Sequence, residues 1–268
     1  MLLEVKDLDI SYGDRLTVSG ASLELDQGEI MSIVGESGSG KTTVIRAIMG
    51  CLPGAGRVSA GSITYNGIDV LKLTRADWRK WYGSEMSMIF QDSGNMINPI
   101  RRIGQQFIAY IQTHRPDAAK DQAYKMACEM LANVNLPNPD NIMNSYPFEL
   151  SGGMRQRVGI AMAMIFRPKL LLADEPTSAL DVTTQAQIIR QIVDIRDQYG
   201  VAVIIVTHNL GVASYVSNKL MVMKQGRVTE SGLRNDVIYN PKDDYTKMLL
   251  KAVPIMGDKC YYDYDYAN

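Results

Sequence analysis

The 268-residue sequence has little cysteine and no long apolar run. Its three cysteines, Cys51, Cys128 and Cys260, are far apart and odd in number. They form neither a zinc motif nor a disulfide framework, which favours a reducing cytosol. The longest apolar runs, such as residues 201–206, have the length of a strand and not the roughly 18–20 residues of a membrane-spanning helix. The first residues have neither a basic leader nor an apolar signal core, so we expect no export.

A large charge of either sign is also missing. The chain has 28 Lys and Arg residues against 29 Asp and Glu residues, which gives a net charge of -1. Without a basic excess to hold a phosphate backbone, we expect no nucleic-acid partner. Hydrophobic residues make up 46% of the chain, as in an ordinary globular protein. The length suits one large domain, or a core with one insert. Together with the cysteine content and the absence of a long apolar run, the composition leads us to expect a soluble cytosolic protein with a sizeable core.

The order of apolar runs and amphipathic segments predicts an α/β fold. Strands are expected at residues 2–10, 21–25, 30–34, 63–65, 86–90, 170–173, 201–206 and 219–223, and helices at 41–49, 183–199 and 209–216. The first two strands alternate apolar and polar residues, which predicts an N-terminal antiparallel β subdomain. The later strands alternate with helices, which predicts a mainly parallel core sheet with helices on both faces.

The character of the chain changes between about residues 93 and 160. Up to residue 150 there is no strand candidate, and helical patterns at 101–112 and 118–134 are broken by Pro116, Pro137 and Pro139. We interpret this segment as a helical subdomain inserted into one domain of residues 1–253. The remaining residues, 254–268, include a run of Tyr and Asp and are predicted to be a disordered tail.

A glycine-rich segment follows the strand expected at 30–34 and opens the helix expected at 41–49. It consists of Gly35, Glu36, Ser37, Gly38, Ser39, Gly40, Lys41 and Thr42, with Thr43 next. This order matches the P-loop pattern in full, and a flexible turn alone would not require it. The glycines let backbone N–H groups curl round phosphates, and the helix N-terminus adds a favourable dipole. Lys41 is expected to reach the β- and γ-phosphates, and Thr42 to bind Mg²⁺.

Two acidic residues end the strand expected at 170–173. Asp174 lies at the carboxyl end of the strand and is expected to face the metal ion. Glu175 is expected to orient or deprotonate the attacking water. Taken alone, these acids would be interpreted as a cap for the next helix. The P-loop upstream favours the catalytic interpretation.

A second candidate anion site begins at Ser151. Ser151 is a favourable N-cap, and Gly152 and Gly153 leave room for a ligand at the first turn of the next helix. An ordinary capped helix is the alternative. Because the P-loop already supplies one helix N-terminus to its own phosphates, we predict that this second one serves nucleotide held by another chain in a two-fold dimer.

Together these residues resemble the nucleotide-binding subunit of an ABC transporter, over residues 1 to about 253. Residues 150–156 match the family's signature, and residues 178–181, which end at Asp181, match its nucleotide-contacting D-loop. The resemblance implies a P-loop NTPase fold of the ABC cassette type with ATP and Mg²⁺ as ligands.

Three further residues acquire roles from the same resemblance. It implies that Tyr12 stacks on adenine, that Gln91 contacts Mg²⁺ or water and links the site to the membrane partner, and that His208 contacts the γ-phosphate. Each residue taken singly also suits a structural role. Tyr12 would be an exposed strand aromatic, Gln91 a loop amide and His208 a helix cap. The order of all the motifs along the chain favours the functional roles.

Within this family the chain is similar to the importers of peptides and nickel. Residues 145–157 resemble that subgroup's signature region, with Phe148 in place of a more usual histidine. Residues 240–250, which include Tyr245, resemble its C-terminal helix. Peptide importers commonly continue into a cysteine-bearing extension, and only Cys260 is present here. On this ground the chain is more similar to nickel or metal-chelate importers, and peptide import stays open.

The resemblance implies an ATPase that energises an importer of peptides or of nickel and metal chelates. The expected partners are a second ATP-binding subunit, for which a paralogue is favoured, two transmembrane permeases and, indirectly, an extracytoplasmic solute-binding protein. The chain would be cytoplasmic and peripheral on the inner face of the cell membrane. One alternative is a soluble ABC ATPase acting on DNA or ribosomes, which the neutral charge disfavours. Another is a nucleotide-gated switch, which Glu175 and His208 disfavour.

Overall fold

The computed structural model describes residues 1–91, 96–178, 180–253, 255–256 and 259–260. The chain divides into two compact units. We name them the sheet unit, which comprises Met1–Arg75 and Gly200–Asn268, and the helical unit, which comprises Ala76–Tyr199. The helical unit extends beyond the expected insert of about 93–160, because it includes two strands that pair with each other.

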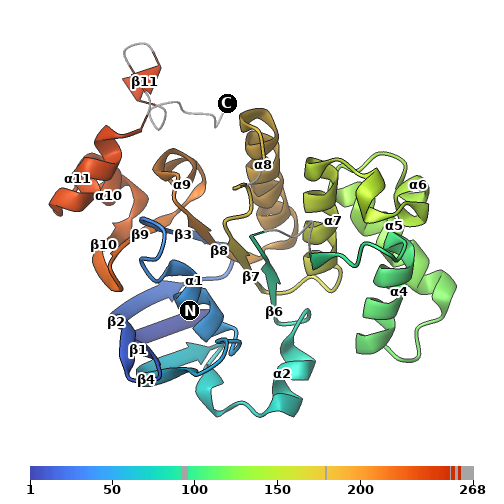
Figure 1. Ribbon diagram of the computed structural model, residues 1–268, viewed down its shortest axis with the longest axis horizontal. Helices are drawn as coiled ribbons and strands as arrows, with labels where there is room; N and C mark the ends of the chain where they lie inside the picture. Colours follow the sequence, from blue (N-terminus) through green and yellow to red (C-terminus); the bar gives the residue numbers. More distant parts are fainter. Residues whose placement is uncertain (92–95, 179, 254, 257–258, 261–268) are drawn as a thin grey trace. The chain divides into compact units, whose positions relative to one another are not determined.

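The strands of the sheet unit lie in the order β5-β4-β1-β2-β10-β9-β3-β8 (Figure 1). β1 pairs antiparallel with β2 and β4, whereas β3 pairs parallel with β8 and β9. The predicted antiparallel subdomain and the predicted parallel strands are therefore both present. The bounds are β1 Leu3–Tyr12, β2 Arg15–Leu25, β3 Ile30–Val34, β4 Gly56–Tyr65, β5 Ile68–Asp69, β8 Ala202–Thr207, β9 Lys219–Lys224 and β10 Arg227–Leu233.

The parallel strands β3 and β8 are buried along their whole length. A strand buried on both faces has a continuous apolar sequence, which explains the runs found in these two segments. The helices of this unit are α1 Lys41–Ile48, α9 Leu210–Val216, α10 Arg234–Tyr239 and α11 Asp244–Lys251. α9, α10 and α11 share one apolar cluster with β3 and β9, and Figure 1 shows α10 and α11 beside β9 and β10.

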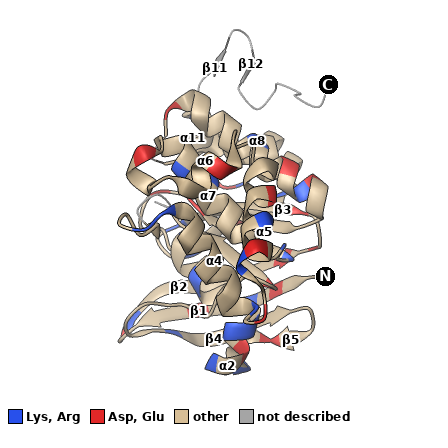
Figure 2. Cartoon of the chain, turned by 90° about the vertical axis from the view of Figure 1, so that its right-hand side faces the viewer, with Lys and Arg blue, Asp and Glu red and all other residues tan. Residues whose placement is uncertain are grey.

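The helical unit contains one pair of parallel strands. Along the chain, most of its helices lie between these two strands. β6 and β7 pair parallel, with Ile89 opposite Ala173. Figures 1 and 2 show α4, α5, α6 and α7 gathered together, and the buried side chains of Phe107 and Ile111 contribute to their core. The bounds are α2 Arg75–Trp81, β6 Met86–Ile89, α4 Ile103–His114, α5 Lys120–Asn133, α6 Pro139–Asn144, α7 Gly152–Met164, β7 Leu170–Asp174 and α8 Val182–Tyr199.

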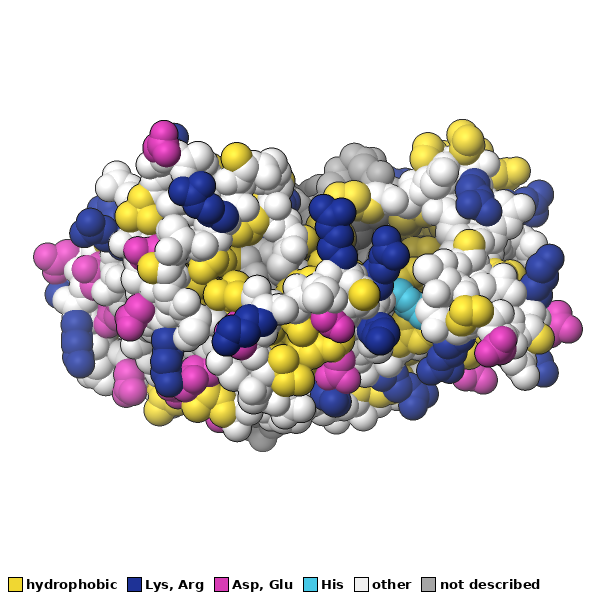
Figure 3. Space-filling model, turned by 90° about the horizontal axis from the view of Figure 1, so that it is seen from below, with side chains coloured by type: hydrophobic (Ala, Val, Ile, Leu, Met, Phe, Trp, Pro, Cys, Tyr) yellow, Lys and Arg dark blue, Asp and Glu magenta, His cyan; other side chains and the backbone are white. Residues whose placement is uncertain are grey.

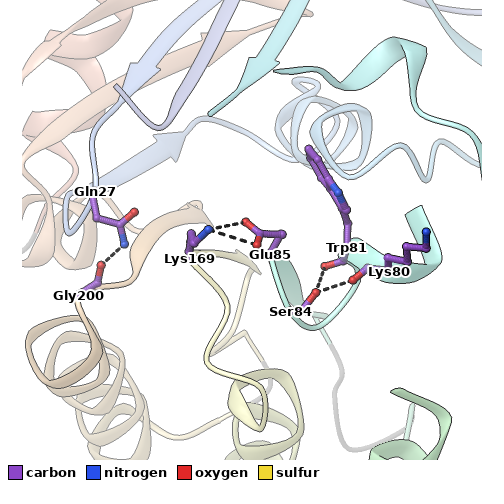
Figure 4. A network of polar contacts seen from close by, with 7 residues as sticks. All are labelled: Gln27, Lys80, Trp81, Ser84, Glu85, Lys169 and Gly200. Carbon is purple, nitrogen blue, oxygen red and sulfur yellow. Dashed lines mark hydrogen bonds and ion pairs between the residues drawn. The ribbon is translucent and has the colours of Figure 1, made fainter. Parts of the chain in front are cut away.

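Polar contacts fix the strand starts within each unit (Figure 4). In the helical unit, the ammonium of Lys169 lies 3.1 Å from a carboxylate oxygen of Glu85, and the Lys169 backbone N–H donates to the Glu85 carbonyl. In the sheet unit, the side-chain amide of Gln27 donates to the carbonyl of Gly200. Glu85 and Lys169 directly precede β6 and β7, whereas Gln27 and Gly200 lie in the segments that lead into β3 and β8.

Some expectations from the sequence differ from the structure. The helical pattern is broken after α5 as predicted, but Pro139 also begins a helix, α6, that was not predicted, because the first helical position needs no backbone N–H. The helices α2 and α10 and the strand β10 were not predicted. Within the tail expected to be disordered, Ile255–Met256 pairs antiparallel with Lys259–Cys260, and the rest of the tail lies outside the described residues.

The helices and the surface charges agree with the composition of the chain. No helix in the described ranges has both the length and the apolar character needed to cross a membrane. On the face that Figure 3 presents, basic and acidic side chains are interspersed, as the near-zero net charge leads one to expect.

An irregularity in the β1–β4 pairing depends on one glycine. The register shifts between Lys6 and Asp9, and Asp7 between them has a positive φ of 47°. Gly61 of β4 lies opposite with a φ of +89°, and a Cβ there would lie 2.5 Å from the carbonyl oxygens of Lys6 and Asp7. A β-bulge of this kind bends the strand and requires a residue without a side chain at the close approach.

We predict that Gly61→Ala destabilises the protein more than Gly67→Ala does. Gly67 has a similar φ of +79°, but no atom lies within 4 Å of its Cβ position. Gly67→Ala should therefore cost only the left-handed backbone strain of about 1 kcal/mol, whereas Gly61→Ala should cost about 2 kcal/mol more for the clash. Denaturant unfolding of both variants measures the difference. Equal losses of unfolding free energy would contradict this account of the bulge.

Candidate functional site

The P-loop and His208 lie at the same edge of the sheet unit. β3 and β8 are parallel neighbours, with Val34 opposite Thr207. Gly35 begins the P-loop directly after β3, and His208 directly follows β8 with an exposed side chain. Because parallel strands place their carboxyl ends at one edge, the structure brings together two predicted site segments that are far apart in sequence. Asn209, and not His208, is the N-cap of α9, so the helix-cap alternative for His208 is wrong.

The glycines of the P-loop are required by close approaches and by backbone conformation. A Cβ on Gly35 would lie 2.1 Å from the carbonyl oxygen of Met223 in β9. A Cβ on Gly40 would lie 2.9 Å from Val18, and the φ of Gly40 is +100°. Gly38 has a φ of +79°, with open space around its Cβ position. The loop is therefore packed tightly against two strands and turned by residues that only glycine suits.

Lys41 forms hydrogen bonds with the backbone of the P-loop. Its side chain is only 4% exposed, and its ammonium donates to the carbonyls of Gly35 at 2.8 Å and Glu36 at 2.7 Å. The backbone N–H of Ser39 also donates to the Glu36 carbonyl, and the N–H of Gly226 donates to the Ser39 carbonyl. The carbonyls of the loop are thus turned toward donors of the protein itself. This arrangement leaves other N–H groups of the loop to face a ligand.

Several groups of the loop suit a phosphate. Ser39 Oγ is buried and has no hydrogen-bond partner among the described residues, so it is a donor that a phosphate oxygen would satisfy. Gly40 caps α1 without a side chain, which leaves N–H groups of the first turn for an anion. Thr42 and Thr43 are half-buried in this first turn. These donors, the hydroxyl of Thr42 and the Lys41 ammonium fit a nucleotide with Mg²⁺.

Tyr12 ends β1, and its ring packs against the backbone of β4. The residue is half-buried, and a Cβ at Gly56 would lie 2.7 Å from Tyr12 Cε1. This contact fixes one edge of the ring. Adenine stacking on Tyr12 stays a prediction.

A second group of predicted residues lies in the helical unit. Asp174 is the last residue of β7 and only 2% exposed, and Gln91 follows β6 with an exposed side chain. Since β6 and β7 are parallel neighbours, Gln91, Asp174 and Glu175 all lie near the carboxyl ends of one strand pair. Glu175 has a positive φ of 44°, which is unusual for a residue with a side chain. Strained backbone of this kind is concentrated at functional sites.

The predicted second anion site begins helix α7. Ser151 is its N-cap, and Ser151 Oγ accepts a hydrogen bond from the N–H of Met154 at 3.3 Å. The side-chain amide of Gln156 donates to the carbonyl of Pro176 at 2.8 Å. This bond connects α7 to the segment that follows Glu175. The signature helix and the acidic strand end are therefore held together within the helical unit.

Asp181 lies beside the start of α7 and caps the next helix. A pocket of about 370 Å³ is lined by Ser151, Gly152, Gly153 and Asp181, among others. The Asp181 carboxylate accepts from the N–H of Thr184 at 3.0 Å and from its hydroxyl at 2.7 Å. These hydrogen bonds, the backbone one first, lower the pKa of Asp181. Asp181 is therefore an ionised cap of α8 at the rim of a pocket, a structural role that its position after the signature did not indicate.

One contact to the P-loop was missed by the sequence reasoning. The hydroxyl of Tyr245 in α11 accepts a hydrogen bond from the N–H of Glu36 at 3.1 Å. No local pattern indicates it, because the two residues are separated by 209 positions. Only the packing of α11 on the sheet unit brings them together.

The chain is similar in sequence to known proteins. The sequence matches the family described as "ABC transporter" over residues 18–178. The oligopeptide transport ATP-binding protein OppD of Salmonella typhimurium is 43% identical over 258 residues, which are 95% of this chain and 76% of that protein. The dipeptide transport ATP-binding protein DppD of Escherichia coli is 40% identical over 257 residues, 94% of this chain and 78% of that protein.

Solved structures resemble this chain as well. One is a dimeric ATP-binding cassette in a post-hydrolysis state with ADP and phosphate bound. It has a TM-score of 0.76 and 26% identity, and the match covers 87% of this chain and 99% of that one. Another is cbiO1 of Clostridium perfringens, part of an ABC transporter complex, with a TM-score of 0.76, 25% identity and coverage of 89% and 91%.

We predict that Lys41→Ala weakens Mg-ATP binding by about 10- to 100-fold. The substitution removes a charge-assisted donor to phosphate and the two bonds that close the loop. Isothermal titration with Mg-ATP measures the change, and a thermal melt of each protein verifies folding. Lys72→Ala, which removes an exposed lysine from a surface ion pair, is the control and should bind as the wild type does. Tight binding by a folded Lys41→Ala protein would refute the P-loop assignment.

Proposed function

Because the chain belongs to the ABC transporter family and is an ATPase of this kind, we propose that it energises the import of peptides through a membrane permease. The P-loop, with its orphaned Ser39 hydroxyl and buried Lys41, is the observation that carries the nucleotide assignment. OppD and DppD are named for oligopeptide and dipeptide transport, which supports peptides over nickel or metal chelates as the solute. The same similarity, over 95% of this chain, disfavours a soluble ATPase acting on DNA or ribosomes.

Binding begins with the residues of the sheet unit. The P-loop N–H groups, the Ser39 hydroxyl and the Lys41 ammonium would hold the β- and γ-phosphates, and Tyr12 would stack on adenine. His208, beside the P-loop at the strand edge, would contact the γ-phosphate. Thr42 would hold Mg²⁺, which would supply positive charge to the phosphate oxygens, and we assign the same ligand to Asp174 and Gln91 of the helical unit.

Hydrolysis requires a group that accepts a proton from water. Glu175 is half-buried and has a positive φ of 44°, a strained conformation of the kind found at functional sites. We assign to its carboxylate the role of orienting the attacking water and accepting its proton. Asp174, at the end of β7, is only 2% exposed, and the charge of a bound Mg²⁺ would stabilise a carboxylate buried to this extent.

A second cassette is proposed to complete the site. Ser151, Gly152, Gly153 and Asp181 line a pocket within the helical unit, at the N-terminus of α7. We assign this pocket to nucleotide held by the partner cassette, which we propose is a paralogue. Two permeases would hold the pair on the cytoplasmic face of the membrane, and a solute-binding protein would deliver the peptide to them from outside.

We predict that Glu175→Gln lowers ATP turnover roughly 100-fold or more while Mg-ATP binding is kept. The assay uses the assembled transporter in vesicles, with solute-binding protein loaded with a short peptide or with nickel. The wild type should hydrolyse ATP faster with the peptide-loaded protein, and the variant should show no such stimulation. Comparable hydrolysis by wild type and variant would remove Glu175 from its role. Stimulation by nickel and not by peptide would overturn the solute assignment alone.

A further prediction tests the shared site. Ser151→Arg places a bulky cation at the start of α7, where it obstructs the cap and the close approach at Gly152 and Gly153. ATPase activity of the assembled transporter should collapse, while the isolated chain binds Mg-ATP nearly as the wild type does. Gln198→Arg, on the exposed side of α8, is the matched control for the added charge. If the isolated, folded Ser151→Arg chain loses ATP binding to the same extent, the motif serves its own P-loop.

A further inference from the structure

The C-terminal helix α11 makes a direct hydrogen bond to the P-loop. The Tyr245 hydroxyl accepts from the Glu36 N–H at 3.1 Å, and the Tyr245 side chain is only 6% exposed. The ammonium of Lys224, at the end of β9, lies 4.6 Å from the centre of the Tyr245 ring. The ring is therefore held between the core of the sheet unit and a cation, with its hydroxyl directed at the loop.

The position of Tyr245 is fixed by the way α11 begins. The carboxylate of Asp243 caps the helix by accepting from the N–H groups of Tyr245 and Thr246. The carboxylate of Glu230 in β10 accepts from the N–H groups of Lys242 and Asp243, which attaches the start of α11 to the sheet. A capped and attached helix start gives Tyr245 little freedom to move.

Packing along the rest of α11 adds to this restraint. Leu250 and Val253 are buried in the apolar cluster that includes Val34, the last residue before the P-loop, and Val222 of β9. Figure 1 shows α11 next to α10 at the side of β10. The helix therefore rests on the same strands that support the P-loop.

The hydrogen bond acts on the peptide group between Gly35 and Glu36, whose carbonyl, that of Gly35, accepts from the Lys41 ammonium. The Glu36 carbonyl accepts from the Lys41 ammonium and from the Ser39 N–H, and the Glu36 N–H is held by Tyr245. Glu36 is thus anchored through both of its backbone polar groups. Burial raises the pKa of the Tyr245 phenol, and the phenol oxygen is the acceptor for this N–H.

We propose that Tyr245 is a positioning residue that holds the P-loop in its phosphate-binding conformation, so that α11 tunes the affinity of the chain for nucleotide. This inference rests on the proposed function of the P-loop as the Mg-ATP site. Loss of the hydroxyl leaves the Glu36 N–H without its acceptor and allows the peptide to rotate. Rotation of this peptide moves the Gly35 carbonyl, so the Lys41 ammonium loses one fixed acceptor and the loop must be reordered when phosphate binds.

The test removes one hydroxyl from each of two adjacent residues of α11. Tyr245→Phe keeps the ring, its packing and the Lys224 contact, and deletes only the acceptor. Thr246→Val is the matched control, because Thr246 is fully buried and its hydroxyl has no partner among the described residues. Titration of the full chain should show Mg-ATP binding about three- to tenfold weaker for Tyr245→Phe and within twofold of wild type for Thr246→Val.

Amide hydrogen exchange gives a readout that general loosening of α11 would not reproduce. Exchange at the Glu36 N–H should become faster in nucleotide-free Tyr245→Phe than in wild type or Thr246→Val, whereas exchange in β8 stays unchanged. Equal binding by all three proteins overturns the proposal, and so does equal weakening by both variants. Failure of the wild type to bind Mg-ATP would count against the proposed function of the P-loop and not against Tyr245 alone.

Discussion

The pairing of β3 between β8 and β9 is the constraint on which the sheet unit depends. Val34 lies opposite Thr207 on one side and Val222 on the other, and all three strands run in the same direction. The chain therefore leaves them at one edge, where it forms the P-loop, the segment with His208 and the turn at Gln225. Because β3 and β8 are buried on both faces, a slip of the register would displace apolar residues from two cores at once.

This constraint also explains why the P-loop tolerates so little side-chain volume. Met223 of β9 and Val18 of β2 lie against Gly35 and Gly40, so the loop is confined by neighbouring strands before any ligand is present. Lys41, Gly226 and Tyr245 then form hydrogen bonds with polar groups of its backbone. Confinement by strands and anchoring by hydrogen bonds have the same effect, because both reduce the ordering that phosphate binding must otherwise supply.

The sequence predicts those features that depend on neighbours along the chain. The P-loop, Asp174 after an apolar strand and the Ser151 cap are local patterns, and the structure places each of them as expected. The features that were missed depend on contacts between distant segments. The bulge at Gly61 depends on the β1–β4 register, and the Tyr245 contact depends on the docking of α11. The short helix α6 was missed because a proline that ends a helical pattern and one that begins a helix look the same in the sequence.

Ser151 and Asp181 raise the question of how a capping residue also serves a ligand. A cap uses acceptor capacity, since Ser151 Oγ accepts from Met154 and the Asp181 carboxylate accepts from Thr184. The proton of the Ser151 hydroxyl is left over, and so are N–H groups of the first turn of α7, all of which are donors. The pocket at Ser151 therefore keeps the groups that an anion requires after the helix has been capped. Asp181 has no donor to offer, and its ionised carboxylate at the same pocket repels phosphate unless a donor or cation comes between them. The role that the structure shows for Asp181 is to hold Thr184 at the start of α8, and the Cβ position of Gly153 lies 2.8 Å from the same Thr184.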